Sequence, residues 1–237
     1  MIEIRKSEER GKTQLGWLKS YHSFSFGRYY DPKHVHFGPL RVLNDDVVMP
    51  GTGFGMHDHD NMEIVTYVIK GTLEHRDSMG TKGSIGEEDV QRMTAGTGVS
   101  HSEQNASKEN PVHFFQIWFI PSQQGLAPSY EQKKFSHAQR RNVFLPVASR
   151  QKELGGVAIN QDVTMWVASL DAVTEKHVSI QNTRGAYVHI VEGEVRINGT
   201  TLTSGDAAAI REESRFSITA VENSEVIFFD VPLVGWD

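Results

Sequence analysis

The sequence predicts an all-β protein made of two β-barrels. Three observations support this fold class. Short apolar runs recur along the chain at intervals of about 8–12 residues, turn residues separate most of them, and no segment between them shows the longer periodicity of a helix. Glycine, at 21 residues, recurs between the runs and suits tight turns.

The expected strands are short runs rich in β-branched and aromatic residues. Turn pairs such as Pro50-Gly51, Lys70-Gly71 and Asn198-Gly199 bound most of them. The runs are residues 40–48, 64–69, 113–120, 163–170, 186–191, 195–197 and 226–231. They fall in both halves of the chain, as two barrels require.

The two halves share a local pattern that indicates a duplicated barrel. Residues 66–73 and 188–195 each form an apolar strand, a tight glycine turn and a returning strand. We therefore expect an N-terminal metal-binding barrel at residues 1–125 and a C-terminal barrel at residues 147–237. Residues 126–146 are the expected linker, because the chain from Pro121 to Pro146 holds three of the eight prolines and lacks strand alternation. A short helix is expected there, at about residues 130–139.

Composition limits the possible partners. The formal net charge is −6 and Lys and Arg never run longer than two, which argues against nucleic acid and against an anionic membrane surface. No apolar stretch approaches the roughly 20 residues of a membrane span. Cysteine is absent, so a metal site must use nitrogen and oxygen ligands. A cytoplasmic location and a monomer are the expectations that fit these properties.

Two residue pairs carry the strongest functional signal. In a strand, residues i and i+2 point to the same face, so His57 and His59 can converge on one point while Asp58 faces away. His101 and Glu103 repeat this spacing. Three imidazoles and one carboxylate suit a divalent first-row cation such as Fe²⁺, Mn²⁺, Co²⁺, Ni²⁺, Cu²⁺ or Zn²⁺.

A single pair of this kind is weak evidence in a chain with 11 histidines, since His34 and His36 form another one. The two candidate pairs differ because each follows closely spaced glycines, which allow tight turns and close backbone approach at a barrel rim. Their repetition favours one metal site built from both pairs.

The segment from Gly51 to Gly71 resembles the first cupin motif. A glycine, five residues, the pair His57 and His59, three residues and Glu63 follow one another, and the turn glycine comes one residue later than usual. The second segment, residues 94–103 (TAGTGVSHSE), lacks the proline of the general second cupin motif and adds a glutamate after the histidine. In this it resembles the pirin family, as do residues 21–31, 40–48 and 74–80. The likeness covers nearly the whole N-terminal half and, more weakly, the second.

The resemblance implies a bicupin, with two jelly-roll-like barrels packed together, similar to the shorter bacterial pirin-like proteins. It assigns His57, His59, His101 and Glu103 as ligands of one metal, with Fe²⁺ expected first, and leaves Glu63 in the surrounding second layer. The second half has no His-x-His pair, so its barrel is expected to be degenerate and metal-free.

Proteins of this kind are associated with quercetin 2,3-dioxygenase activity, in which O₂ opens a flavonol ring and carbon monoxide is released. The resemblance therefore implies a small aromatic substrate, with Glu103 as general base. Candidate substrate-binding residues are Phe54, Met56, Phe115 and Ile117. Two alternatives stay open: a non-enzymatic metal-binding regulatory or redox-sensing protein, and another metal-dependent enzyme such as an isomerase or hydrolase.

Overall fold

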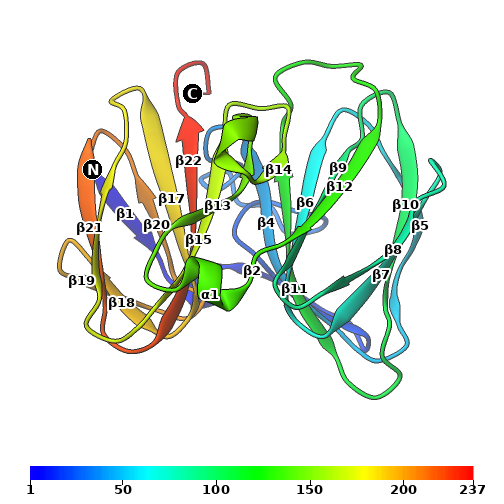
Figure 1. Cartoon of the computed structure of the whole chain (residues 1–237), viewed down its shortest axis with the longest axis horizontal. Helices are drawn as coiled ribbons and strands as arrows, with labels where there is room; N and C mark the ends of the chain where they lie inside the picture. The colour runs from blue at the N-terminus through cyan, green and yellow to red at the C-terminus, as the bar shows by residue number, and fades with distance from the viewer. Residues whose placement is uncertain (237) are drawn as a thin grey trace. The chain divides into compact units, whose positions relative to one another are not determined.

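The computed structural model describes residues 1–236 of the chain, and strands make up nearly all of its regular structure (Figure 1). The helical parts are α1 (His137–Arg140) and two short 3-10 turns (Ser7–Glu9 and Lys152–Leu154). Within residues 1–236, none of the helices has the length and apolar character that a membrane crossing needs. The all-β fold class predicted from the sequence is confirmed.

The chain forms two compact units. One, here the N-terminal barrel, contains residues 11–134 and 157–161, and the other, here the C-terminal barrel, contains residues 1–10, 135–156 and 162 onward. The first ten residues group with the C-terminal barrel because β1 pairs with β20. The domain bounds expected from the sequence stay a prediction.

The N-terminal barrel consists of two antiparallel sheets with the strand orders β12-β9-β6-β11-β4-β3-β2 and β5-β10-β7-β8 (Figure 1). Its strands are β2 (Gly11–Gln14), β3 (Leu18–His22), β4 (Leu40–Val48), β5 (Gly53–His59), β6 (Glu63–Lys70), β7 (Thr72–Asp77), β8 (Lys82–Gly86), β9 (Asp89–Thr94), β10 (Val99–Asn105), β11 (Val112–Phe119) and β12 (Ser129–Lys134). The short strand β14 (Val157–Ala158) is grouped with the same unit but belongs to neither of these sheets.

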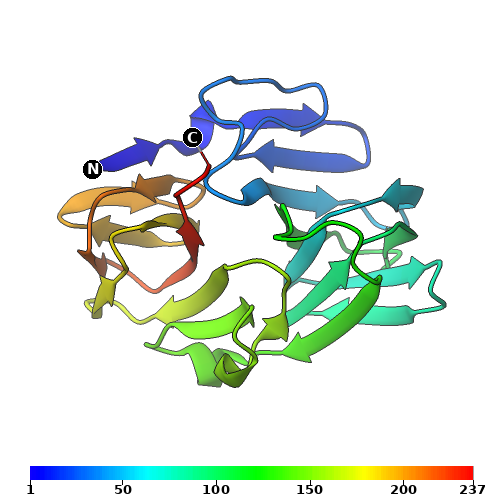
Figure 2. The ribbon, with the colours of Figure 1, turned by 90° about the horizontal axis from the view of Figure 1, so that it is seen from above.

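The C-terminal barrel has a larger sheet that includes the order β1-β20-β17-β22-β15-β13 and a smaller one with the order β16-β21-β18-β19. Its strands are β1 (Ile2–Arg5), β13 (Leu145–Ser149), β15 (Thr164–Leu170), β16 (Glu175–Ser179), β17 (Arg184–Glu192), β18 (Glu194–Ile197), β19 (Thr200–Thr203), β20 (Ala207–Ile210), β21 (Arg215–Ala220) and β22 (Ser224–Pro232). Seen from above, its yellow, orange and red strands curve around a common interior (Figure 2).

The interiors of the two barrels differ in polarity. In the C-terminal barrel one large apolar cluster, which includes Val188, Leu202 and Ile218, fills the space between the sheets. In the N-terminal barrel, two smaller apolar clusters contain Leu73 and Val99, residues on neighbouring strands near opposite ends of β10. The buried polar positions of β10 therefore lie between apolar layers.

The segment expected to be a linker is more ordered than its composition suggests. Residues 129–134 form β12, which pairs along its whole length with β9, and only α1 is helical. The prediction of a helix at about residues 130–139 is thus wrong in its first half. An edge strand pairs on one side only and tolerates charges such as Lys133 and Lys134, so β12 shows no apolar alternation.

Candidate metal centre

Strands β5 and β10 bring the two predicted residue pairs together. They pair antiparallel with His101 directly opposite His57 and Val99 opposite His59, and the register shifts between His101 and Glu103. Such a bulge redirects the side chains that follow it. Hydrogen bonding between these strands therefore sets the separation of the two pairs.

Three histidine rings converge at this point. The ring centroids of His57, His59 and His101 lie 4.5–4.9 Å apart, and each ring offers a nitrogen within 4.8 Å of the others. The Nε2 atoms of His57 and His101 are 3.1 Å apart. Two ligands at about 2.1 Å from one ion and at about a right angle would be about 3.0 Å apart. The arrangement fits a single cation.

The protonation of these rings also suits a cation. The Nδ1 of His57 lies 2.7 Å from the carbonyl oxygen of Gly55. Because the carbonyl can only accept, the ring proton is on Nδ1, and Nε2 has a free lone pair. Burial, together with the neighbouring histidines, lowers the pKa of His59 to about 4 and the pKa of His101 to about 3. Both rings are neutral near pH 7, the form that binds metal.

Glu103 is buried and held by neutral donors. Its Oε1 accepts hydrogen bonds from Gln91 Nε2 (2.9 Å) and Thr66 Oγ1 (3.1 Å), and its Oε2 accepts one from Gln116 Nε2 (2.6 Å). All three of these donors are uncharged, so none of them supplies a positive charge to balance the carboxylate. A bound cation would supply that charge, which is the second indication that the site fits a metal.

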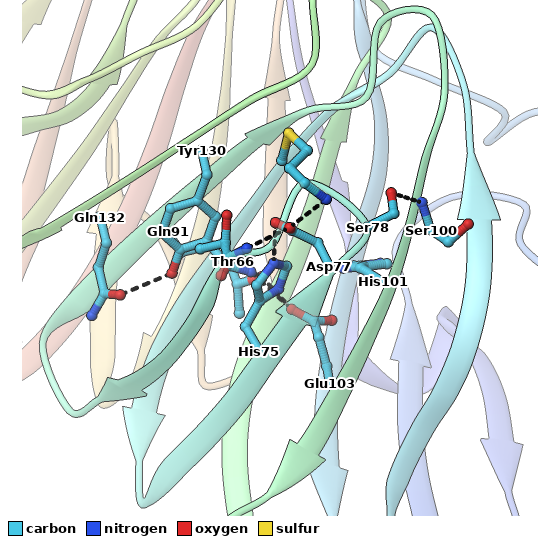
Figure 3. A network of polar contacts seen from close by, with 12 residues as sticks. Thr66, His75, Asp77, Ser78, Gln91, Ser100, His101, Glu103, Tyr130 and Gln132 are labelled. Carbon is cyan, nitrogen blue, oxygen red and sulfur yellow. Dashed lines mark hydrogen bonds and ion pairs between the residues drawn. The ribbon is translucent and has the colours of Figure 1, made fainter.

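The structure groups the predicted ligands in two overlapping sets. His57, His59 and His101 form one, and His101 and Glu103 form the other together with His75 (Figure 3). Both sets lie in the N-terminal barrel. The sequence interpretation missed His75, although it lies in the segment EHRDSMG that was noted for its family resemblance. The usable signal there was another i, i+2 pair of polar residues, His75 and Asp77.

Glu63 lies elsewhere. Its carboxylate accepts hydrogen bonds from Thr94 Oγ1 and from the backbone and side chain of Asn160, and neither of these residues is a predicted ligand. Burial raises its pKa, against the effect of those bonds. Along β6 successive side chains alternate, and Thr66 is the residue that reaches Glu103, so Glu63 belongs to the opposite face.

A cavity of about 790 Å³ adjoins the histidines, and His57, His59 and Glu103 line it. One part of its wall is aromatic, with Trp17, Phe54, Phe26 and Trp118, and Met56 also lines it. The Trp118 ring packs edge to face against the His59 ring, with the two ring centroids 4.9 Å apart.

Of the expected substrate-binding residues, Phe54 and Met56 line this cavity, whereas Phe115 and Ile117 are not among its lining residues. The β11 residues that line it are Gln116 and Trp118. Side chains of a strand alternate between faces, so the odd-numbered residues of β11 point away from the side of Gln116. Both faces of β11 are largely buried, which is why hydrophobicity did not distinguish them.

The cavity also has a polar side, formed by β3 and β4. Ser20, His22, Asn44 and Asp46 line it. His22 Nδ1 lies 2.8 Å from Asn44 Oδ1. Asp46 is buried, and burial together with the nearby charges of Asp45 and Glu103 raises its pKa to about 7. One wall of the cavity can therefore stack on an aromatic ring while the other receives polar substituents.

A pair of β-barrels, one of which holds converging histidines beside a buried glutamate, defines a metal-binding cupin protein of the two-barrel type. The comparison with known families is specific. The Pirin model matches residues 3–119, and the model described as "Quercetinase C-terminal cupin domain" matches residues 146–231. The chain belongs to the pirin family.

Individual relatives are similar over the full length. Quercetin 2,3-dioxygenase of Escherichia coli K12 is 42% identical over 234 residues, covering 99% of this chain and 100% of the relative. A putative quercetin 2,3-dioxygenase of Pasteurella multocida is 40% identical over 235 residues, covering 98% and 100%. The crystal structure of the bacterial pirin YhhW from Escherichia coli in complex with nickel(II) has a TM-score of 0.94 at 41% identity, covering 99% and 100% of the two chains.

Proposed function

We propose that the chain is a metal-dependent dioxygenase of the pirin type, which opens the ring of a flavonol such as quercetin with O₂. The observation that supports this most directly is the convergence of three histidine nitrogens beside a cavity with aromatic walls. The full-length similarity to a protein named quercetin 2,3-dioxygenase agrees with it.

The proposed ligands are His57, His59, His101 and Glu103. Four protein ligands leave one or two positions open on a metal that prefers five or six, which is typical of catalytic sites. We propose Fe²⁺ as the native metal; Mn²⁺, Co²⁺, Ni²⁺, Cu²⁺ and Zn²⁺ suit the same donors. The related YhhW structure, which contains nickel(II), supports a divalent cation.

The bound cation would lower the pKa of a coordinated flavonol hydroxyl. Glu103 is the proposed acceptor of that proton. Three of its roughly four acceptor positions are filled by Gln91, Thr66 and Gln116, so the remaining one would serve the metal and the proton in turn. These donors also fix the orientation of the carboxylate. The flavonol that has lost its proton is electron-rich and reacts with O₂.

The remaining residues would bind and orient the substrate. Phe54, Met56 and Trp118 offer apolar surface to the flavonol rings. Ser20 and Asp46 offer hydrogen-bond acceptors to hydroxyl groups on the distal part of the molecule. The cavity volume lies in the usual range for small-molecule sites, about 300–1,000 Å³. The cytoplasmic location and the monomeric state stay predictions.

The test is turnover of quercetin by protein reconstituted with Fe²⁺ under anaerobic conditions and then exposed to O₂. Loss of the flavonol absorbance should match O₂ consumption and release of carbon monoxide, one to one. A flavonol that binds and stays unconverted with each of the six metals would contradict the proposal and favour a regulatory, metal-binding protein.

A further inference from the structure

His75 and Asp77 form a buried pair next to the metal centre that the roles proposed above do not use. Both side chains are fully buried, and His75 Nε2 lies 3.0 Å from Asp77 Oδ2. The other oxygen of Asp77 accepts hydrogen bonds from the backbone N–H groups of Met79 (3.0 Å) and Thr81 (2.9 Å). Asp77 is thus an acceptor on both oxygens and is fixed to the backbone.

These contacts determine which nitrogen of the His75 ring carries the proton. Because Asp77 accepts, Nε2 of His75 must donate, and in a neutral ring Nδ1 then presents a lone pair. This Nδ1 is buried and has no hydrogen-bond partner. The ring is held from one side by Tyr130, whose centroid lies 5.0 Å away and whose hydroxyl donates to Gln132 (Figure 3).

His101 has the complementary requirement. If its Nε2 binds the cation, the proton of its ring must reside on Nδ1, and that Nδ1 is also buried with no hydrogen-bond partner. Metal-binding histidines almost always donate this second N–H to an acceptor, which fixes the ring and raises its basicity. The rings of His101 and His75 are neighbours, with centroids 5.4 Å apart and ligand atoms within 4.8 Å.

We propose that His75 is a positioning residue of the metal centre, which accepts the hydrogen bond of His101 Nδ1–H while Asp77 fixes its own ring. The proposal rests on the metal site proposed above. Glu103 also lies close to His101. Its remaining acceptor position, however, is assigned above to the metal and to the flavonol proton, so it is not proposed as the partner of His101 Nδ1–H. In the metal-bound protein the donor of His101 and the acceptor of His75, both without a partner in this structure, would satisfy each other.

The chain contains a matched control for this pair. His113 Nε2 lies 2.7 Å from Asp45 Oδ1 in the same barrel, on the neighbouring strands β11 and β4. This pair has the same chemistry, is partly exposed, and includes no member of the two ligand groups. Its loss should change stability but not metal binding.

The test compares His75→Phe, His75→Gln and the double variant His75→Phe/Asp77→Asn with the control His113→Phe/Asp45→Asn. Phenylalanine removes the acceptor, whereas the amide oxygen of glutamine can restore it. The double variant avoids leaving a buried, unpaired carboxylate, and circular dichroism and thermal melting of the metal-free proteins establish folding. Zn²⁺ and Co²⁺ affinities are measured by competition with a chromophoric chelator, with no flavonol present.

We expect the affinity for Zn²⁺ to fall by about 10- to 100-fold in His75→Phe and in the double variant, in line with the loss of an outer hydrogen-bond partner. It should recover in His75→Gln and stay at the wild-type value in the control. NMR of the Zn²⁺ form should show a slowly exchanging His101 Nδ1–H that is lost in the double variant.

Two results would overturn the proposal. One is an unchanged affinity in the folded double variant. The other is X-ray absorption of the Co²⁺ form with one nitrogen ligand fewer in His75→Gln, which would make His75 a ligand instead. Tight metal binding without quercetin turnover would refute the proposed function and leave this inference intact.

Discussion

The Nε2 atoms of His57 and His101 lie 3.1 Å apart, although 44 positions separate the two residues in the sequence. Their strands pair antiparallel, with these two residues directly opposite each other. The backbone therefore brings the two nitrogens together, and both rings start from buried or half-buried positions. The backbone thus preorganises this pair of nitrogens for one cation.

Replacement of His101 by alanine should remove tight metal binding, since it deletes a ligand shared by both candidate groups. We expect the affinity for Zn²⁺ to fall by more than about 100-fold, beyond the effect of losing an outer partner, and quercetin turnover to disappear. Elemental analysis and chelator competition measure this. His36→Ala is the control, because His36 belongs to the other His-x-His pair and bonds to the carbonyl oxygen of Gly38. Stoichiometric metal in His101→Ala would contradict the assignment.

In the metal-free protein, His59 and His101 should make a contribution to stability that is lost as the pH falls below about 6.5. Burial and the neighbouring histidines lower the pKa of His59 to about 4 and that of His101 to about 3, from an ordinary value of 6.5. In this window the unfolded chain binds protons at these two histidines that the folded chain does not bind, so their contribution to the free energy of unfolding decreases with falling pH. Urea unfolding of the metal-free protein at a series of pH values measures the slope. It should be smaller in His59→Asn/His101→Asn, and an equal slope in both proteins would refute this origin.

Two glycines of β5 provide a test of how closely the ligand strands must approach. A Cβ at Gly53 would lie 2.3 Å from the carbonyl oxygen of Glu103, whereas a Cβ at Gly55 would meet nothing within 4 Å. Gly53→Ala should therefore push β5 and β10 apart, with a loss of stability of about 1–3 kcal/mol and weaker metal binding. Gly55→Ala should change both quantities little. Equal effects of the two substitutions, measured by urea unfolding and chelator competition, would argue against this packing constraint.

The ligand pairs could be predicted from the sequence because strand geometry is local. The i, i+2 spacing places His57 with His59 and His101 with Glu103 whatever the rest of the fold does. The partners of these residues could not be predicted in the same way. His75 comes next to His101 only through the pairing of β7 with β10, and Glu63 points away because of the face that β6 turns to the interior. Both depend on tertiary structure.

The face of β11 that lines the cavity could not be predicted from the sequence either. Residues 113–120 are a nearly continuous apolar run, and both faces of β11 are largely buried. Such a run predicts a strand but not which side faces the cavity. Phe115 and Ile117 were the natural candidates by hydrophobicity, whereas Gln116 and Trp118 line the cavity.

The variants Trp118→Leu and Phe115→Leu test which face of β11 contacts the substrate. Trp118 lines the cavity and touches His59, so its truncation should raise KM for quercetin by about 10-fold or more, the effect of losing apolar contact in a pocket. Phe115→Leu should leave KM near the wild-type value and lower only stability. Steady-state kinetics and thermal melting of each variant measure these outcomes. A larger rise in KM for Phe115→Leu than for Trp118→Leu would instead support Phe115 as a substrate-binding residue, as predicted from the sequence.

Asp46→Asn should stabilise the protein at alkaline pH. Burial, with the charges of Asp45 and Glu103, raises the pKa of Asp46 to about 7 from an ordinary 3.8, against the hydrogen bond from Ser20 and the nearby His113. The folded state thus keeps a proton that the unfolded chain releases, so the contribution of Asp46 to the free energy of unfolding falls as the pH rises from about 4 to about 7, opposite in sign to that of His59 and His101.

Asparagine carries no such charge, so the variant should be more stable than the wild type above pH 7, on the order of a few kcal/mol. Near pH 4 the difference should disappear, because Asp46 is then largely protonated in the folded state. Urea unfolding of the metal-free proteins at both pH values measures it. A pH-independent difference would show that shape, rather than charge, distinguishes the variant. Since Asp46 lines the cavity, a stabilised variant that also binds quercetin less tightly would indicate that the barrel tolerates this buried carboxylate because the substrate uses it.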